Sequence, residues 1–182
     1  MAFIGLRLPP EVGRHLVAVD VPGERVDYGH AHVTISYLGD NTPVEEAMRA
    51  AAVLVHVAQQ FKPIRCKTDK VDHFDAGDGG KYPIICPVKS PELHRFKTAL
   101  EEALDLAGVE YDKKWPVFKP HTTLSFSEEP VESRAMPLLE WVSHEVVLWG
   151  GDDRDQGAVV EVPFSPSMAQ RVAARVTSWR GF

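Results

Sequence analysis

Two six-residue segments of this sequence share one pattern, and this repetition constrains the fold more than any other feature. Residues 32–37 and 121–126 both read His-x-Thr-apolar-Ser-aromatic. Alternation of polar and apolar residues is typical of a β-strand that has one polar face and one apolar face. The two copies lie about half a chain length apart, which is the separation expected of two equivalent lobes.

Successive side chains of a strand point to opposite faces, so every second residue shares a face. The first copy is therefore predicted to place His32, Thr34 and Ser36 together, and the second copy His121, Thr123 and Ser125. If two central strands turn these faces toward each other across a groove, two imidazoles and two hydroxyls meet in one volume. The alternative is that both are the solvent faces of half-buried antiparallel strands.

Three helix starts share another pattern, in which Ser or Thr is followed by proline. A Ser or Thr side chain caps a helix, and proline suits the first helical turn. The expected caps are Thr42, Ser90 and Ser165. Thr42 with Glu45 matches a capping box, and this helix is predicted to end near Phe61.

The two later helices carry apolar residues at helical spacing. In the helix that starts at Ser90, Gly108 is the expected stop. Its predicted buried stripe contains Leu93, Phe96, Leu100, Leu104 and Ala107. The stripe expected in the last helix contains Met168, Val172, Val176 and Trp179.

Seven short segments between these helices have strand character, and turn residues separate them. They are residues 2–8, 32–38, 64–74, 82–89, 118–126, 141–149 and 158–164. The glycine- and aspartate-rich residues 75–80 and 150–153 are predicted to be hairpin loops. Helices mixed with mostly antiparallel strands predict the α+β class rather than a doubly wound parallel sheet.

Composition excludes several classes of protein. The 182 residues are 44% hydrophobic and 25% charged, which is typical of a folded globular chain. A net charge of −6 argues against a binder of long nucleic acids, which needs a surplus of Lys and Arg. The cysteines Cys66 and Cys86 form no zinc or redox motif. Without a leader peptide or an apolar run of membrane-spanning length, the protein is expected to be cytoplasmic.

Two histidines and two threonines in one groove can cleave a phosphodiester bond without a metal. One neutral imidazole removes a proton from the attacking oxygen, while a protonated imidazole donates one to the leaving oxygen. An ordinary pKa near 6.5 allows both forms of histidine to coexist near neutrality. The threonine hydroxyls can donate hydrogen bonds to the non-bridging phosphate oxygens. We expect no cofactor and no metal.

The sequence resembles the two-histidine (2H) phosphoesterase superfamily, which includes the 2′,5′ RNA ligase-like proteins and cyclic nucleotide phosphodiesterases. Residues 32–39 and 118–124 are similar to the two signature motifs of that superfamily. The similarity begins at Phe3 and continues through the helix start at Ser90 to Ser125. The resemblance implies that residues 1–182 form one α+β domain of two intertwined, pseudo-symmetric lobes with antiparallel sheets, flanking helices and a central cleft.

The resemblance also implies a catalytic set and a class of substrates. The set consists of His32, Thr34, His121 and Thr123. The implied substrates are small nucleotides or short oligonucleotides that carry a 2′,3′-cyclic phosphate or a 2′,5′ or 3′,5′ linkage. Residues 111–125 are similar to those of phage enzymes that degrade cyclic di- or trinucleotides and so counter bacterial CBASS immunity. A cyclic oligonucleotide is therefore one substrate hypothesis.

Other hypotheses stay open at this stage. A binding module could hold a nucleotide or RNA end in the same groove without turnover. A 2′,5′ RNA ligase or phosphodiesterase would act on RNA, and a metal-dependent phosphatase would lose its activity in EDTA. His30 would share the face of His32 if the strand extended that far. The aromatic residues that could stack a nucleobase are Tyr82, Trp115 and Phe118.

Overall fold

A computed structural model of the chain describes residues 1–77, 79–114, 117–150 and 157–165. Its helices are α1 (Pro10–Val17), α2 (Val44–Ala58) and α3 (Pro91–Leu106), with a short 3-10 helix η1 (Tyr28–His30). Its strands are β1 (Ala2–Arg7), β2 (Glu24–Arg25), β3 (His32–Gly39), β4 (Ile64–His73), β5 (Tyr82–Pro87), β6 (His121–Ser127), β7 (Arg134–Ser143), β8 (Glu145–Gly150) and β9 (Gly157–Pro163).

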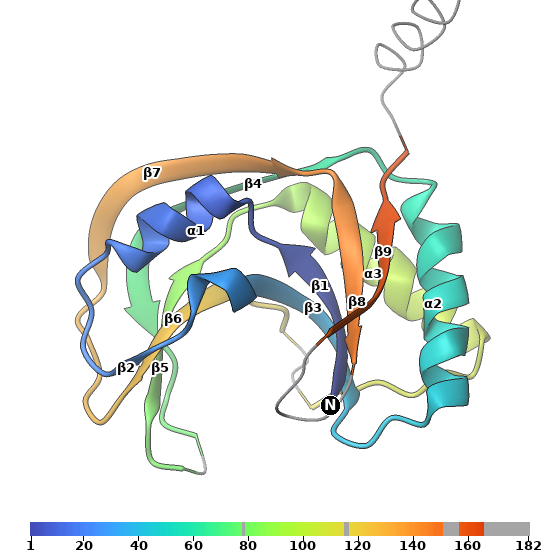
Figure 1. The fold of residues 1–182 in the computed structure, drawn as a ribbon, viewed down its shortest axis with the longest axis horizontal. Coiled ribbons are helices and arrows are strands. Elements are labelled where there is room, and N and C mark those ends of the chain that lie inside the picture. Colours follow the sequence, from blue (N-terminus) through green and yellow to red (C-terminus); the bar gives the residue numbers. More distant parts are fainter. Residues whose placement is uncertain (78, 115–116, 151–156, 166–182) are drawn as a thin grey trace, which may run out of the picture.

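The strands form two antiparallel sheets, which together with the helices confirm the predicted α+β class. The first sheet has the strand order β3-β1-β8-β9, and the second has the order β2-β6-β5-β4-β7. The two motif strands therefore belong to different sheets. Figure 1 shows the long pair β4 and β7 arching over the molecule, with the first sheet on the opposite side from β5 and β6.

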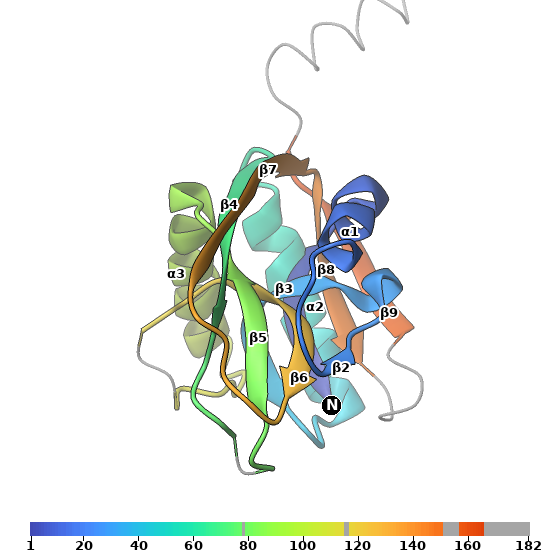
Figure 2. The same cartoon turned by 90° about the vertical axis from the view of Figure 1, so that its left-hand side faces the viewer.

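Helix α3 links the two sheets. It packs against β4 of the second sheet and β3 of the first, and it also contacts α2. Helix α2 covers β8 and β9, and Figure 1 shows it at the outer side of the first sheet. In Figure 2, α1 and α3 lie at opposite sides of the view, with β5 and β6 between them.

The sequence of α3 explains its formation. The Ser90 hydroxyl accepts a hydrogen bond from the Leu93 backbone N–H at 3.1 Å, so the predicted cap is confirmed. At the other end, Gly108 has a φ of +64°, which favours glycine and ends the helix as predicted. Four of the five stripe residues are fully buried, whereas Ala107 is exposed; the buried four are Leu93, Phe96, Leu100 and Leu104.

Other sequence predictions were wrong. Thr42 does not cap α2: Pro43 is the N-cap residue, and the Thr42 hydroxyl donates to the Gly39 carbonyl instead. Residues 141–149 are not one strand, because β7 ends at Ser143 and β8 begins at Glu145. Helix α1, which starts with proline in its first turn, and the short strand β2 were not predicted. The last predicted helix lies outside the described residues.

A β-bulge interrupts the alternation in β3. In the pairing of β1 with β3, Gly5 lies opposite Thr34, but Ile4 lies opposite Ser36. Ile35 is therefore an extra residue, and the side chains of Ile35 and Ser36 are both buried. The next residue, Tyr37, packs with a cluster made of Phe3, Val147 and Trp149.

Strand β6 carries a bulge at the equivalent position. Ile85 of β5 lies opposite Thr123, and Ile84 lies opposite Ser125, which leaves Leu124 as the extra residue. Leu124 and Ser125 are again both buried. In each motif, the bulge thus falls after the His-x-Thr triplet. The prediction that each serine shares the face of the histidine and threonine was wrong, because the bulge turns the serine to the covered side.

Both cysteines are free, and both are buried in strands. Burial raises the pKa of the Cys66 and Cys86 thiols to about 12. Such thiols stay protonated and unreactive near neutral pH. No helix in the described ranges is long and apolar enough to cross a membrane.

Replacing Ser90 by Ala removes the only observed side-chain acceptor at the start of α3 in the described chain. We expect the free energy of unfolding to fall by about 1 kcal/mol in urea titrations. Thr42→Ala is the matched control, since Thr42 caps no helix. It should lower the free energy of unfolding by clearly less than Ser90→Ala does. Equal losses in the two variants would contradict the assigned role of Ser90.

Candidate active site

The two motif histidines begin the two motif strands. His32 is the first residue of β3, and His121 is the first residue of β6. These strands come from different sheets but contact each other. Both imidazoles are half-buried. The structure therefore brings the two predicted histidines to the same junction between the sheets.

Each imidazole is held by the same kind of hydrogen bond. His32 Nδ1 lies 2.7 Å from the carbonyl oxygen of His30, and His121 Nδ1 lies 2.7 Å from that of Lys119. A carbonyl oxygen can only accept, so Nδ1 carries the proton in both rings. The Nε2 atom of each neutral ring is then left with a lone pair, which can accept a proton. In both motifs, the anchoring carbonyl belongs to the residue two positions earlier.

Aromatic rings pack around both imidazoles. The ring centroid of His32 lies 4.6 Å from that of Phe3 and 5.5 Å from that of Trp149. His121 makes an edge contact with Phe74, with centroids 4.6 Å apart. These contacts fix the ring planes from one side and exclude water from that side. None of these three aromatic neighbours was predicted from the sequence, because they come from β1, the end of β8 and the loop after β4, which are far apart in the chain.

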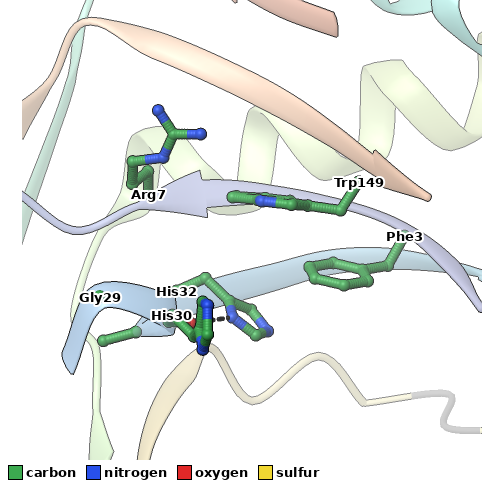
Figure 3. A pocket seen from close by; sticks show the side chains of 7 residues that line it. Phe3, Arg7, Gly29, His30, His32 and Trp149 are labelled. Carbon is green, nitrogen blue, oxygen red and sulfur yellow. Dashed lines mark hydrogen bonds between the residues drawn. The ribbon is translucent and has the colours of Figure 1, made fainter. Parts of the chain in front are cut away.

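A pocket opens beside His32, and Figure 3 shows the side chains around it. Its lining includes Phe3 and Arg7 of β1, Trp149 of β8, and His30 with His32. His30 does not extend β3, because it belongs to η1. The condition for a shared strand face is therefore not met, although the His30 side chain lines the pocket beside His32.

Arg7 is a pocket residue that sequence analysis missed. It lies opposite His32 in the pairing of β1 with β3. Its guanidinium forms ion pairs with Glu145 at 3.8 Å and Glu161 at 2.6 Å, and it lies 5.9 Å from the centre of the Trp149 ring. The strand pattern 2–8 indicated that Arg7 would lie at a strand end. Only the order of the strands placed it beside His32.

Burial lowers the pKa of both imidazoles below the ordinary value of 6.5. For His32, the hydrogen bond to the His30 carbonyl raises the pKa and so opposes the effect of burial. Positive charge on His121 and His30 lowers the pKa of His32 further. For His121, the bond to the Lys119 carbonyl again opposes the effect of burial. The charge interaction means that protonating one histidine disfavours protonating the other. Such a pair favours one neutral and one protonated ring in the acidic range.

The two motif threonines are half-buried and lie two residues after their histidines. No bulge separates Thr34 from His32 or Thr123 from His121, so each pair shares one strand face. Gly5 lies opposite Thr34, and a Cβ atom there would come 2.5 Å from the Val33 carbonyl oxygen. This close approach requires glycine in β1 at that point.

The predicted stacking residues have other contacts. Tyr82 meets His73 edge-on, and Phe118 meets His94 edge-on, each packing beside the main hydrophobic core. Trp115 lies outside the described residues. Within the described ranges, no group of three or more His, Cys, Asp or Glu side chains could hold a metal ion.

Replacing His121 by Gln removes a positive charge near His32 but keeps a polar side chain. The pKa of His32 should then rise, while staying below 6.5 because its burial is unchanged. A titration of the histidine C2–H signals by NMR measures this change. The exposed His15 serves as the internal control. An unchanged His32 pKa would show that the two rings do not interact.

Residues 20–155 match the 2′-5′ RNA ligase superfamily. No curated protein sequence matches the chain. Among solved structures, TT0787 of Thermus thermophilus has a TM-score of 0.74 at 21% identity, covering 91% of this chain and 98% of that one. E. coli LigT complexed with ATP has a TM-score of 0.67 at 15% identity, covering 90% and 97%.

A third solved structure, described as a phosphoesterase, has a TM-score of 0.65 at 16% identity, covering 90% of this chain and 97% of that one. All three likenesses extend over nearly the whole fold. At such identities, the solved structures establish the fold. The family match spans most of the chain and includes both His-x-Thr motifs. The chain therefore belongs to the 2′-5′ RNA ligase superfamily, which confirms its resemblance to the two-histidine phosphoesterases.

Proposed function

We propose that this protein is a metal-independent phosphodiesterase that uses His32 and His121 as a general acid–base pair. The observation that carries this proposal is the matched anchoring of the two rings. Each Nδ1 donates to a backbone carbonyl 2.7 Å away, on strands that contact each other across the two sheets. A binding site alone does not need two imidazoles held in the same tautomer.

In the proposed reaction, one imidazole takes up a proton and the other gives one up. Nε2 of the neutral histidine takes a proton from the attacking water, whose oxygen forms a bond to phosphorus. As the bond from phosphorus to the leaving oxygen breaks, the protonated histidine donates its Nε2 proton to that oxygen. The first ring ends protonated and the second neutral, so solvent exchange restores the starting state. The orientation of the substrate decides which histidine is the base.

Thr34 and Thr123 are proposed to bind the phosphate. Each shares a strand face with its histidine, two residues further along the strand. Their hydroxyls can donate hydrogen bonds to non-bridging oxygens, which gain negative charge as the attack proceeds. Because the hydroxyls come from both motifs, the phosphate would lie between the two strands. In this proposal the phosphate is within reach of the Nε2 atoms of both histidines.

Small nucleotides are the substrate class that these observations support best. Family membership supports a phosphoesterase activity of the 2′,5′ RNA ligase type. Solved structures of LigT are described as complexes with ATP, with 3′-AMP and with phosphate. The net charge of −6 disfavours long nucleic acids. We propose 2′,3′-cyclic phosphates and cyclic di- or trinucleotides as substrates before 2′,5′-linked RNA.

The test is turnover by the purified protein in EDTA. The panel contains 2′,3′-cyclic nucleotides, 2′,5′ dinucleotides, and cyclic di- and trinucleotides. We expect one class to be hydrolysed, with kcat lowered by about 10²- to 10⁴-fold in His32→Ala and in His121→Ala. Thr34→Val and Thr123→Val should each lower kcat by about 10²-fold.

The matched control is His15→Ala, because His15 lies in α1 and its Nδ1 bonds to the Glu11 carbonyl. Its activity should equal that of the wild type. Nucleotide binding without turnover of any panel member would favour the binding-module hypothesis. Activity that EDTA abolishes would contradict the metal-independent mechanism.

The pH dependence follows from the lowered pKa values. One ring must be neutral and the other protonated, so kcat/KM should be bell-shaped with two apparent pKa values. Both histidines of the free protein have pKa values below 6.5. The maximum of kcat/KM should therefore lie below pH 6.5, and activity should fall as the pH rises above it. A maximum in the alkaline range would rule out this pair of groups.

A further inference from the structure

The bulge that follows each His-x-Thr triplet has two hydrogen-bonding needs. A bulge disrupts the ladder, so the carbonyl of the extra residue needs a donor from elsewhere. The buried serine hydroxyl that follows also needs a partner. In β6, segment 22–26 meets both needs: the Val26 N–H donates to the Leu124 carbonyl at 2.9 Å, and Ser125 donates to the Pro22 carbonyl at 2.6 Å.

In β3, the side chains of an ion pair in α3 supply both hydrogen-bond partners. Lys97 Nζ donates to the carbonyl of Ile35, the extra residue, at 3.2 Å. Ser36 Oγ donates to Glu101 Oε1 at 3.2 Å. Lys97 and Glu101 also bond to each other, one helical turn apart. Their side chains are only 17% and 22% exposed, unlike those of a typical surface pair.

Lys97 also contacts the segment that leads into the second motif. Its Nζ lies 5.1 Å from the centre of the Phe118 ring, three residues before His121. The intervening Lys119 supplies the carbonyl that holds His121. One ammonium group thus bonds to the bulge of the first motif and lies over the aromatic ring beside the second.

We propose that Lys97 is a positioning residue which, with Glu101, holds the bulge of β3 and fixes it relative to the segment before His121. Its catalytic consequence rests on the function proposed above. Nothing in the arrangement requires Lys97 to touch the substrate. Its loss should therefore misplace the imidazoles and lower kcat without weakening substrate binding.

The test compares Lys97→Met with Lys113→Met. The control is matched, because Lys113 pairs with Asp105 at 2.7 Å and lies 4.6 Å from the centre of the Tyr111 ring, but bonds to neither motif strand. We expect Lys97→Met to lower kcat about tenfold or more, with KM within about twofold of the wild type. Lys113→Met should change neither. Lys97→Arg, which keeps the charge and the donors, should restore most of the lost kcat.

A second readout is independent of activity. In ¹H–¹⁵N spectra of the imidazoles, the His32 ring signals should shift in Lys97→Met and stay unchanged in Lys113→Met. Because Lys97→Met leaves the Glu101 carboxylate unpaired, Lys97→Met/Glu101→Gln provides a second variant that removes both charges. Thermal unfolding confirms that each variant folds.

The outcomes separate this inference from the proposed function. Unchanged ring signals and kcat in both folded Lys97 variants would overturn the positioning role, even if His32→Ala abolishes activity. Failure of Lys97→Arg to restore kcat would also overturn it. If the wild type hydrolyses nothing but its ring signals respond to Lys97→Met, the positioning role stands and the proposed function fails.

Discussion

The packing of α3 against both sheets is the constraint on which the rest of the structure depends. Its buried stripe contains Leu93, Phe96, Leu100 and Leu104, each fully buried and each contributing about 1.5–3 kcal/mol. The helix contacts β4 in one sheet and β3 in the other. Because β6 belongs to the sheet of β4, this packing also sets the position of β6 relative to β3. The approach of His32 to His121 follows from it.

Two opposing effects then set the chemistry of the imidazoles. Burial against aromatic rings lowers their pKa values, while the backbone carbonyls that accept from Nδ1 raise them. The same carbonyl bonds fix the tautomer, so Nε2 is the atom available for proton transfer. Without the hydrogen bond to the carbonyl, a buried imidazole would have no fixed orientation, and its pKa would be lower still.

The bulges explain why the repeated pattern is longer than the His-x-Thr triplet. The apolar residue and the serine that follow form the bulge and its anchor on the covered side, as Ile35 and Ser36 do in β3. The two anchors differ chemically: a backbone segment holds one bulge, and the Lys97–Glu101 ion pair holds the other. The two motif strands therefore carry a bulge at the same position but differ in what stabilises it.

The sequence by itself determined the α+β class, most strand positions, the Ser90 cap and the two His-x-Thr triplets, because these depend on local periodicity and on single residues. It did not reveal the bulges, since a bulge depends on the register of the neighbouring strand, and so it misplaced Ser36 and Ser125. Only the tertiary structure brought Arg7, Trp149 and Phe74 to the histidines. Strand order and helix packing set such contacts between residues far apart in the chain, and local sequence patterns do not encode them.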